Sequence, residues 1–183
     1  MDYIQETSYA GKLLLAMPKM SDQPFNRAVV YICVHNQDGA MGIVVNRYAN
    51  FISFSQLLSE LKIDKEEKVV EGIPIHYGGP VEANRGFVLH TNDYTHETTL
   101  KISPGISLSA TLETLDTIAH GNGPEKCIVA LGYAAWGPGQ LEDEVKDSAW
   151  IPISADERLL FDTDVQDKYQ TAFESLGVNA DMI

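Results

Sequence analysis

The sequence is poor in cysteine and in basic residues. Its 183 residues include 2 Cys, and 13 Lys and Arg stand against 26 Asp and Glu, which gives a formal net charge of −13. Cys33 and Cys127 both lie in apolar runs, and neither has a second cysteine at metal-site spacing. We therefore expect buried free thiols, and neither a disulfide framework nor a zinc site.

The shortage of Lys and Arg bears on nucleic-acid binding. Residues 134–183 hold 11 acidic and only 3 basic side chains. Affinity for DNA and RNA comes largely from Lys and Arg displacing counterions from the phosphates. The sequence therefore disfavours direct nucleic-acid binding, and the acidity itself is typical of a well-solvated surface.

Long hydrophobic runs and a positively charged leader are also missing. Asp2 and Glu6 stand where a signal peptide needs positive charge, and the apolar run GKLLLAM is too short to span a bilayer. We expect a cytoplasmic protein that does not enter a membrane.

Common catalytic and nucleotide-binding motifs are absent from the sequence. It has no Walker motif, no G-x-G-x-x-G and no G-x-S-x-G nucleophile turn. No cofactor is predicted, and a non-enzymatic role is favoured.

The patterns that are present predict one α+β domain over residues 1–183. Residues 27–35 and 40–47 are β-branched runs around the turn signal Asn-Gln-Asp-Gly, which predicts a hairpin. Helical spacing appears over residues 53–61, 109–120 and 164–176, the last with Thr163 and Gln166 as a capping box. Strands and helices do not alternate regularly, so α+β is favoured over a doubly wound sheet.

An acidic segment lies between two tryptophans, in the stretch WGPGQLEDEVKDSAW at residues 136–150. Most of its carboxylates suit the first turn of a helix. Helical geometry, however, places Glu144 at the edge of the apolar face and Glu142 on the other side of it, so one carboxylate is expected to lean inward and to need a partner. The candidate partners are Arg27, Arg47 and Arg85, and Trp136 and Trp150 are expected to be core anchors.

A second interpretation gives two of these arginines a ligand. Arg47 ends a strand and Arg85 begins one after Gly78 and Gly79, and glycine amides with arginine forks can hold a carboxylate or phosphate. If these ends converge, they form an anion site. The alternative is a structural ion-pair network in which the arginines match Glu142 and Glu144.

The stretch HTNDYTH contains residue types that suit a metal site. His90, Asp93 and His96 are suitable ligand types for a divalent ion. Their spacing spans a predicted turn, and no second cluster of ligands supports them, so no metal is predicted.

Four stretches in this order resemble the AlgH/YqgE family of bacterial proteins: GKLLLAMPKMSD, HNQDGAMGIVVNR, YGGPVEANRGFVLH and LGYAAWGPGQLEDEVKDSAWI. The resemblance covers about residues 8–165. Ala135 departs from it, because a glycine is expected at that position. The resemblance implies a compact α+β domain with a mixed or antiparallel sheet curved into a pseudo-barrel. It implies no particular reaction, and the name AlgH suggests transcriptional regulation.

These observations favour a binding or regulatory domain that acts through a protein partner or a small anionic ligand. The alternative is an enzyme for a small anionic substrate, with Arg47 and Arg85 as clamps and Glu142 or Glu144 as the base. The candidate ligand-binding residues are Arg47, Gly78, Gly79, Arg85, Glu142 and Glu144.

Overall fold

The structure of the protein is a computed structural model that describes residues 7–19 and 25–182. Its centre is a curled nine-stranded sheet in the order β6-β7-β5-β8-β3-β2-β1-β9, with β4 also paired to β8. Only the β4–β8 pair is parallel among these strands. The strands are β1 Lys12–Ala16, β2 Val29–Asn36, β3 Gly39–Val44, β4 Ile75–Tyr77, β5 Val81–Thr91, β6 Leu100–Ser103, β7 Ile106–Ser109, β8 Cys127–Trp136 and β9 Trp150–Ser154.

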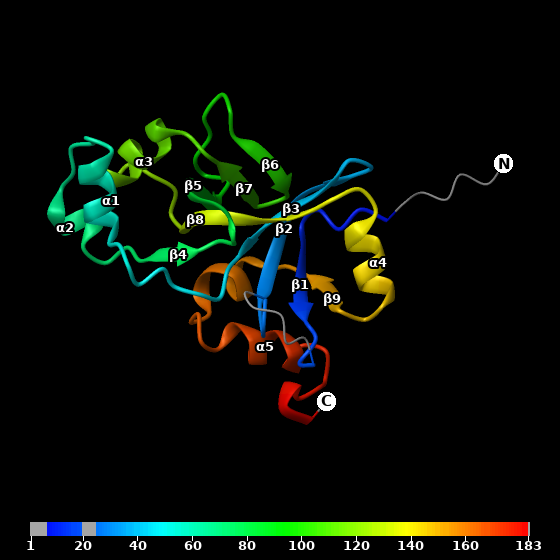
Figure 1. Ribbon diagram of the computed structural model, residues 1–183. Helices are drawn as coiled ribbons and strands as arrows, with labels where there is room; N and C mark the ends of the chain where they lie inside the picture. The colour runs from blue at the N-terminus through cyan, green and yellow to red at the C-terminus, as the bar shows by residue number, and fades with distance from the viewer. Residues whose placement is uncertain (1–6, 20–24, 183) are drawn as a thin grey trace.

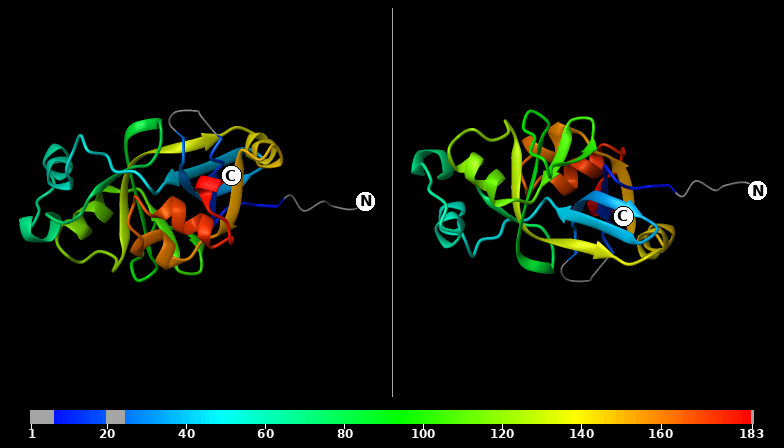
Figure 2. Two further views of the ribbon diagram at one scale, coloured as in Figure 1. Left: turned by 90° about the horizontal axis from the view of Figure 1, so that it is seen from below. Right: turned by 90° about the horizontal axis from the view of Figure 1, so that it is seen from above.

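Short helices cover the two ends and one side of this sheet. Figure 1 shows α1–α3 gathered at one end, α4 at the opposite end beside β9, and α5 against a side of the sheet. Both views of Figure 2 keep α1 and α4 at opposite ends of the molecule. The helices are α1 Phe54–Glu60, α2 Glu67–Val70, α3 Leu112–Ala119, α4 Gln140–Lys146 and α5 Lys168–Glu174, with a π-helical turn at Arg158–Asp162 and a 3₁₀ turn at Ala180–Met182.

Strand β1 is buried on both faces and separates two parts of the core. Leu13 and Leu15 belong to the cluster under α5, whereas Leu14 and Ala16 belong to the cluster that holds Leu141 of α4. Successive side chains of a strand point to opposite faces, so the run LLLA supplies both clusters.

A third cluster lies under α1–α3. Phe54 and Leu58 of α1 pack with Leu115 and Ile118 of α3 over Val129 of β8. Helix α1 begins at a capping box in which the side chains of Ser53 and Gln56 bond each other's backbone amides. The helix predicted over residues 53–61 is therefore confirmed.

The predicted hairpin is also confirmed, as β2 and β3 in antiparallel register from Val30↔Val44 to Asn36↔Gly39. The α+β class and the curved sheet are confirmed as well. The last helix was predicted to start too early: α5 begins at Lys168, and Asp167 at its N-cap makes no side-chain capping bond. The backbone turns at 165–167 before the helix begins, so Thr163 and Gln166 form no capping box there.

No helix in the part of the chain that the structure describes is long and apolar enough to cross a membrane.

Candidate functional site

Glu144 holds together the acidic segment at residues 136–150, which we call the acidic corner. Trp136 and Trp150 donate their indole N–H groups to its Oε2 over 2.8 and 2.9 Å, and Gln140 donates to its Oε1 over 3.0 Å. The two indole rings meet edge to face at 5.8 Å, and both residues are buried. Glu144 therefore leans inward as predicted, and its partners are the two predicted core anchors.

Glu142 contacts a histidine on the hairpin. Its Oε1 lies 2.7 Å from Nε2 of His35, while Nδ1 of His35 accepts the backbone N–H of Tyr9 over 2.8 Å. Because Nδ1 accepts a hydrogen bond, the ring proton is on Nε2, and Nε2–H donates a hydrogen bond to Glu142. The pKa of Glu142 is lowered first by a backbone hydrogen bond at its own residue and then by His35.

The prediction that an arginine pairs with one of these carboxylates is wrong. Over residues 7–19 and 25–182, the arginine ion pairs are Arg27 with Asp181 and Arg85 with Glu82, and neither involves Glu142 or Glu144. Indole and imidazole donors satisfy the carboxylates, and sequence reasoning overlooked them because it searched for opposite charge only.

Gly78 and Gly79 allow two backbone segments to touch. A Cβ on Gly78 would lie 2.2 Å from the carbonyl oxygen of Gly132, and one on Gly79 would lie 2.1 Å from the carbonyl carbon of Tyr133. The amide of Gly78 already donates to the carbonyl of Leu131 over 2.8 Å. The closest approaches of these glycines are therefore to β8, and the carbonyl of Gly78 also accepts the amide of Val44 in β3 over 2.8 Å.

Arg47 and Arg85 have different neighbours. Arg47 donates to the carbonyl of Asn26, and burial lowers its pKa. The guanidinium of Arg85 lies 5.1 Å from the centre of the Phe87 ring and 3.4 Å from Glu82. The two arginines share none of these partners.

Arg85 belongs to a bulge in β5. The register with β8 jumps from Val81↔Tyr133 to Gly86↔Leu131, so residues 82–85 stand opposite Gly132 alone. All four are exposed, and Glu82 has φ +45°, a conformation that non-glycine residues seldom adopt. Tyr133 holds the carboxylate of Glu82 with a 2.8 Å hydrogen bond, which is the main reason its pKa is lowered.

Beside this bulge lies a small apolar cavity of about 150 Å³, which we call the Arg85 cleft. Leu61 and Leu112 line it and are 36% and 57% exposed, so apolar surface extends from the cavity to the solvent. Arg85, Asn84 and Thr111 supply its polar edge. Its other apolar walls are Leu57, Val88, Leu115 and Leu131.

The three candidate metal ligands, His90, Asp93 and His96, each have protein partners. His90 is fully buried, with Nδ1 2.8 Å from the carbonyl of Thr91 and Nε2 2.9 Å from Oγ of Ser109. Asp93 accepts the amide of Glu125 over 2.8 Å, and His96 contacts Glu113. Among the described residues, no group of three potential ligands could hold a metal ion.

Both cysteines are free thiols: Cys33 is buried and Cys127 is partly buried. Burial raises the pKa of both, to about 11 for Cys127. Such thiols are poor nucleophiles at neutral pH.

Sequence reasoning missed two buried basic side chains that lie close together. Lys168 of α5 is 3% exposed and donates from Nζ to the carbonyl of Val45 over 2.9 Å. His76 of β4 is 6% exposed, and its Nδ1 has no hydrogen-bond partner among the described residues. Burial lowers the pKa of Lys168 to about 8, and burial together with the charge of Lys168 lowers that of His76 to about 4.

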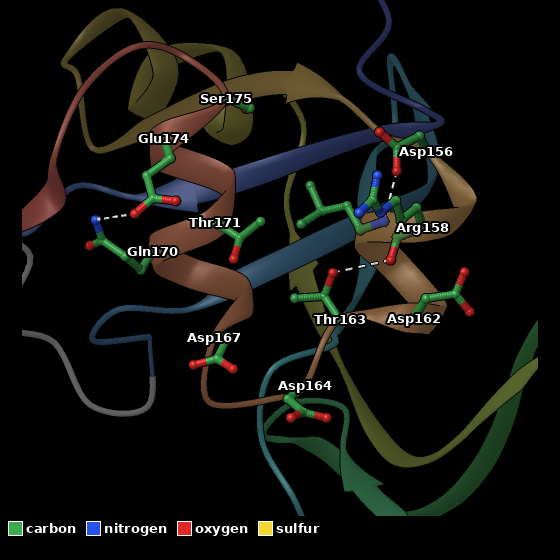
Figure 3. Close-up of a pocket in the computed structure, with 11 residues that line it drawn as sticks. Asp156, Arg158, Asp162, Thr163, Asp164, Asp167, Gln170, Thr171, Glu174 and Ser175 are labelled. Atoms are coloured by element: carbon green, nitrogen blue, oxygen red, sulfur yellow. Dashed lines mark hydrogen bonds between the residues drawn. The ribbon is translucent and has the colours of Figure 1, made fainter.

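Many of the acidic side chains of the C-terminal residues line a hollow of about 660 Å³ between the π-helical turn and α5. Figure 3 shows the side chains of both elements around it. Arg158 is the one basic side chain among the described residues that line it. The acidic ones are Asp156, Asp162, Asp164, Asp167 and Glu174.

With this geometry defined, comparison with known proteins identifies the family. The family model described as AlgH-like (DUF179) matches residues 13–181. The chain belongs to the AlgH-like family. This confirms the resemblance found in the sequence.

Relatives in the AlgH-like family match almost the whole chain. The chain is 48% identical to a UPF0301 protein of Afipia carboxidovorans, over 94% of this chain and 86% of that protein. It is 47% identical to one of Rhodospirillum rubrum, over 92% and 88%.

Solved structures agree with the AlgH-like fold. AlgH from Pseudomonas aeruginosa superposes with a TM-score of 0.83 at 38% identity, covering 100% of this chain and 96% of that one. The protein DIP2367 from Corynebacterium diphtheriae superposes with a TM-score of 0.72 at 17% identity, over 93% and 87%. The second likeness concerns the fold alone.

Proposed function

We propose that this AlgH-like protein is a non-enzymatic cytoplasmic binding domain that acts in regulation through a protein partner held at the Arg85 cleft. The observation that carries the proposal is the β5 bulge, which presents Arg85 at the edge of an apolar cavity. Large apolar side chains that remain exposed beside a cavity are typical of interaction sites.

Backbone strain at the same place supports the proposal. Glu82 adopts φ +45° within the bulge, which costs about 1 to 3 kcal/mol for a residue with a side chain. Such strain persists where the surrounding structure imposes it, and it gathers at ligand-binding positions. The hydrogen bond from Tyr133 to Glu82 helps to hold the bulge in this shape.

The enzyme alternative has less support. Glu142 and Glu144, the two candidate bases, are engaged by His35 and by the two indoles. Among the described residues that line the Arg85 cleft, none is a His, Asp, Glu, Lys or Cys that could act as base or nucleophile. Arg47 contacts the backbone of Asn26, which favours a structural role for it over a second clamp.

Cross-linking in cells tests the proposal. A photoreactive amino acid at position 112, beside the cleft, is expected to give a discrete protein adduct. The same amino acid at position 176 serves as the control, because Leu176 is also exposed but follows α5. If position 112 gives no adduct beyond those of position 176, binding at the cleft is refuted.

A further inference from the structure

The size of the Arg85 cleft indicates what kind of group enters it. Its volume is about 150 Å³. Pockets for small-molecule ligands usually measure about 300–1,000 Å³. The cleft therefore suits one branched apolar side chain from a larger partner better than a whole small molecule.

The polar edge of the cleft carries positive charge. Arg85 is the one charged side chain among the described residues that line it, in a chain of net charge −13. Helix α3 begins at Leu112, behind its N-cap Thr111, so its N-terminus lies at the same edge. A helix N-terminus carries partial positive charge, which Glu113 in the first turn of α3 offsets in part, so Arg85 is the main attraction for a carboxylate here.

Arg85 is available to a partner. Its side chain is 55% exposed, and its ion pair with Glu82 is 3.4 Å long. Exposed pairs of this kind contribute about 0–1 kcal/mol, so exchanging Glu82 for another carboxylate costs little. The guanidinium lies over the ring of Phe87, which belongs to the cluster under α5, so it turns towards the cleft when it pairs with the partner.

The two exposed leucines beside the cleft, Leu61 and Leu112, favour binding of an internal segment of the partner over binding of one of its chain ends. Leu61 follows α1 and Leu112 begins α3, so apolar surface continues from the cavity onto both helices. A segment that extends to both sides of its anchor residue covers both leucines.

Resting on the proposed function, we infer that the partner is an acidic protein segment. One branched apolar side chain of the segment fills the Arg85 cleft, and a nearby Asp or Glu side chain pairs with Arg85 at the N-terminus of α3. The partner is defined here by its chemistry: an apolar anchor with an acidic neighbour, inside a chain.

Selection from a displayed library of random peptides, fused at both ends so that no free C-terminal carboxylate is present, tests this inference. On the parent protein we expect enrichment of peptides that combine a Leu-like residue with an Asp or Glu. Arg85→Glu should lose these peptides by about tenfold or more and should favour peptides with Lys or Arg. Arg158→Glu makes the same charge change in the acidic hollow and should leave the selection unchanged.

A third variant separates the inference from the proposed function. Leu112→Glu removes the exposed apolar side chain at the start of α3, where a carboxylate is compatible with the helix. Peptides that require Leu112 but bind Arg85→Glu equally well would overturn the acidic partner and leave the binding function standing. If no enriched peptide requires Leu112, the cleft is not a binding site and both proposals fall. Unchanged thermal midpoints establish that each variant is folded.

Discussion

Trp136 and Trp150 donate their indole N–H groups to one and the same oxygen, Oε2 of Glu144. The two tryptophans lie 14 positions apart on β8 and β9, with α4 between them in the chain. A single carboxylate thus fixes both strands to the helix that connects them, and one side chain controls the stability of this corner.

Replacing Glu144 by leucine should destabilise the protein strongly. Two buried indole N–H groups would lose their acceptor, at about 1 to 3 kcal/mol each. Glu144→Gln keeps an acceptor oxygen in place and should cost about 1 kcal/mol. Urea unfolding followed by tryptophan fluorescence measures both free energies. Equal losses for the two variants would show that hydrogen bonding to the indoles is not what the carboxylate contributes.

Gly79→Ala should be among the most damaging single substitutions in the chain. The added methyl group would lie within 2.5 Å of three backbone atoms of Tyr133 and Ala134, and backbone cannot move aside as a flexible side chain can. We expect a loss of about 4 kcal/mol or more of unfolding free energy. Gly72→Ala is the matched control, because nothing lies within 4 Å of a Cβ at that position. A thermal midpoint for Gly79→Ala close to that of Gly72→Ala would contradict the close approach to β8.

His76 should make the fold sensitive to mild acid. Its pKa is about 4 in the folded protein, against 6.5 for an unperturbed histidine, so the unfolded chain binds the proton more readily. The associated stability is present above pH 6.5 and is lost as the pH falls towards 4, by about 2 to 3 kcal/mol. Denaturant titrations at several pH values should give a smaller acid loss for His76→Gln than for the parent. Parallel curves for the two proteins would mean that His76 is not the group that titrates.

Lys168 should make the free energy of unfolding depend on pH in the alkaline range. Its pKa is lowered to about 8 from 10.5, so below pH 8 the folded protein bears the cost of a buried ammonium. As the pH rises from 8 towards 10.5, the folded state has lost this proton while the unfolded state still holds it, and stability rises. The free energy of the parent minus that of Lys168→Met should therefore increase by about 2 kcal/mol between pH 7 and pH 10. Taking the difference cancels the titration of other groups, and a constant difference would refute the buried charge.

Local patterns in the sequence were sufficient for several elements. The hairpin follows from two β-branched runs around Asn36–Gly39, and α1 follows from the spacing of Phe54, Leu57 and Leu58. Each signal lies within a few residues of the element that it specifies, so a single sequence contains it.

The partners of the candidate residues could not be predicted in this way. The hydrogen bond between His35 and Glu142 joins residues 107 positions apart, and Arg85 meets the leucines of α1 and α3 only through the fold of the sheet. The bulge arises from the register between β5 and β8. The sequence of residues 82–85 contains no local pattern that predicts this register. A search for opposite charge also could not find the partners of Glu144, because neutral indole N–H groups of Trp136 and Trp150 bind its carboxylate where an arginine was expected.

Strand β8 has a consequence for how the chain folds during synthesis. It pairs with β4 and β5 through residues 127–133 and with β3 through residues 134–136, so it links two halves of the sheet. Until residue 136 has left the ribosome, β3 and β5 cannot both be paired with β8 along their full length. Strand β1 gains its second neighbour, β9, later still. Unpaired strand edges invite association with other chains, and distant pairings form slowly. The nascent chain therefore carries open edges for most of its synthesis and has most need of chaperones before its last third emerges.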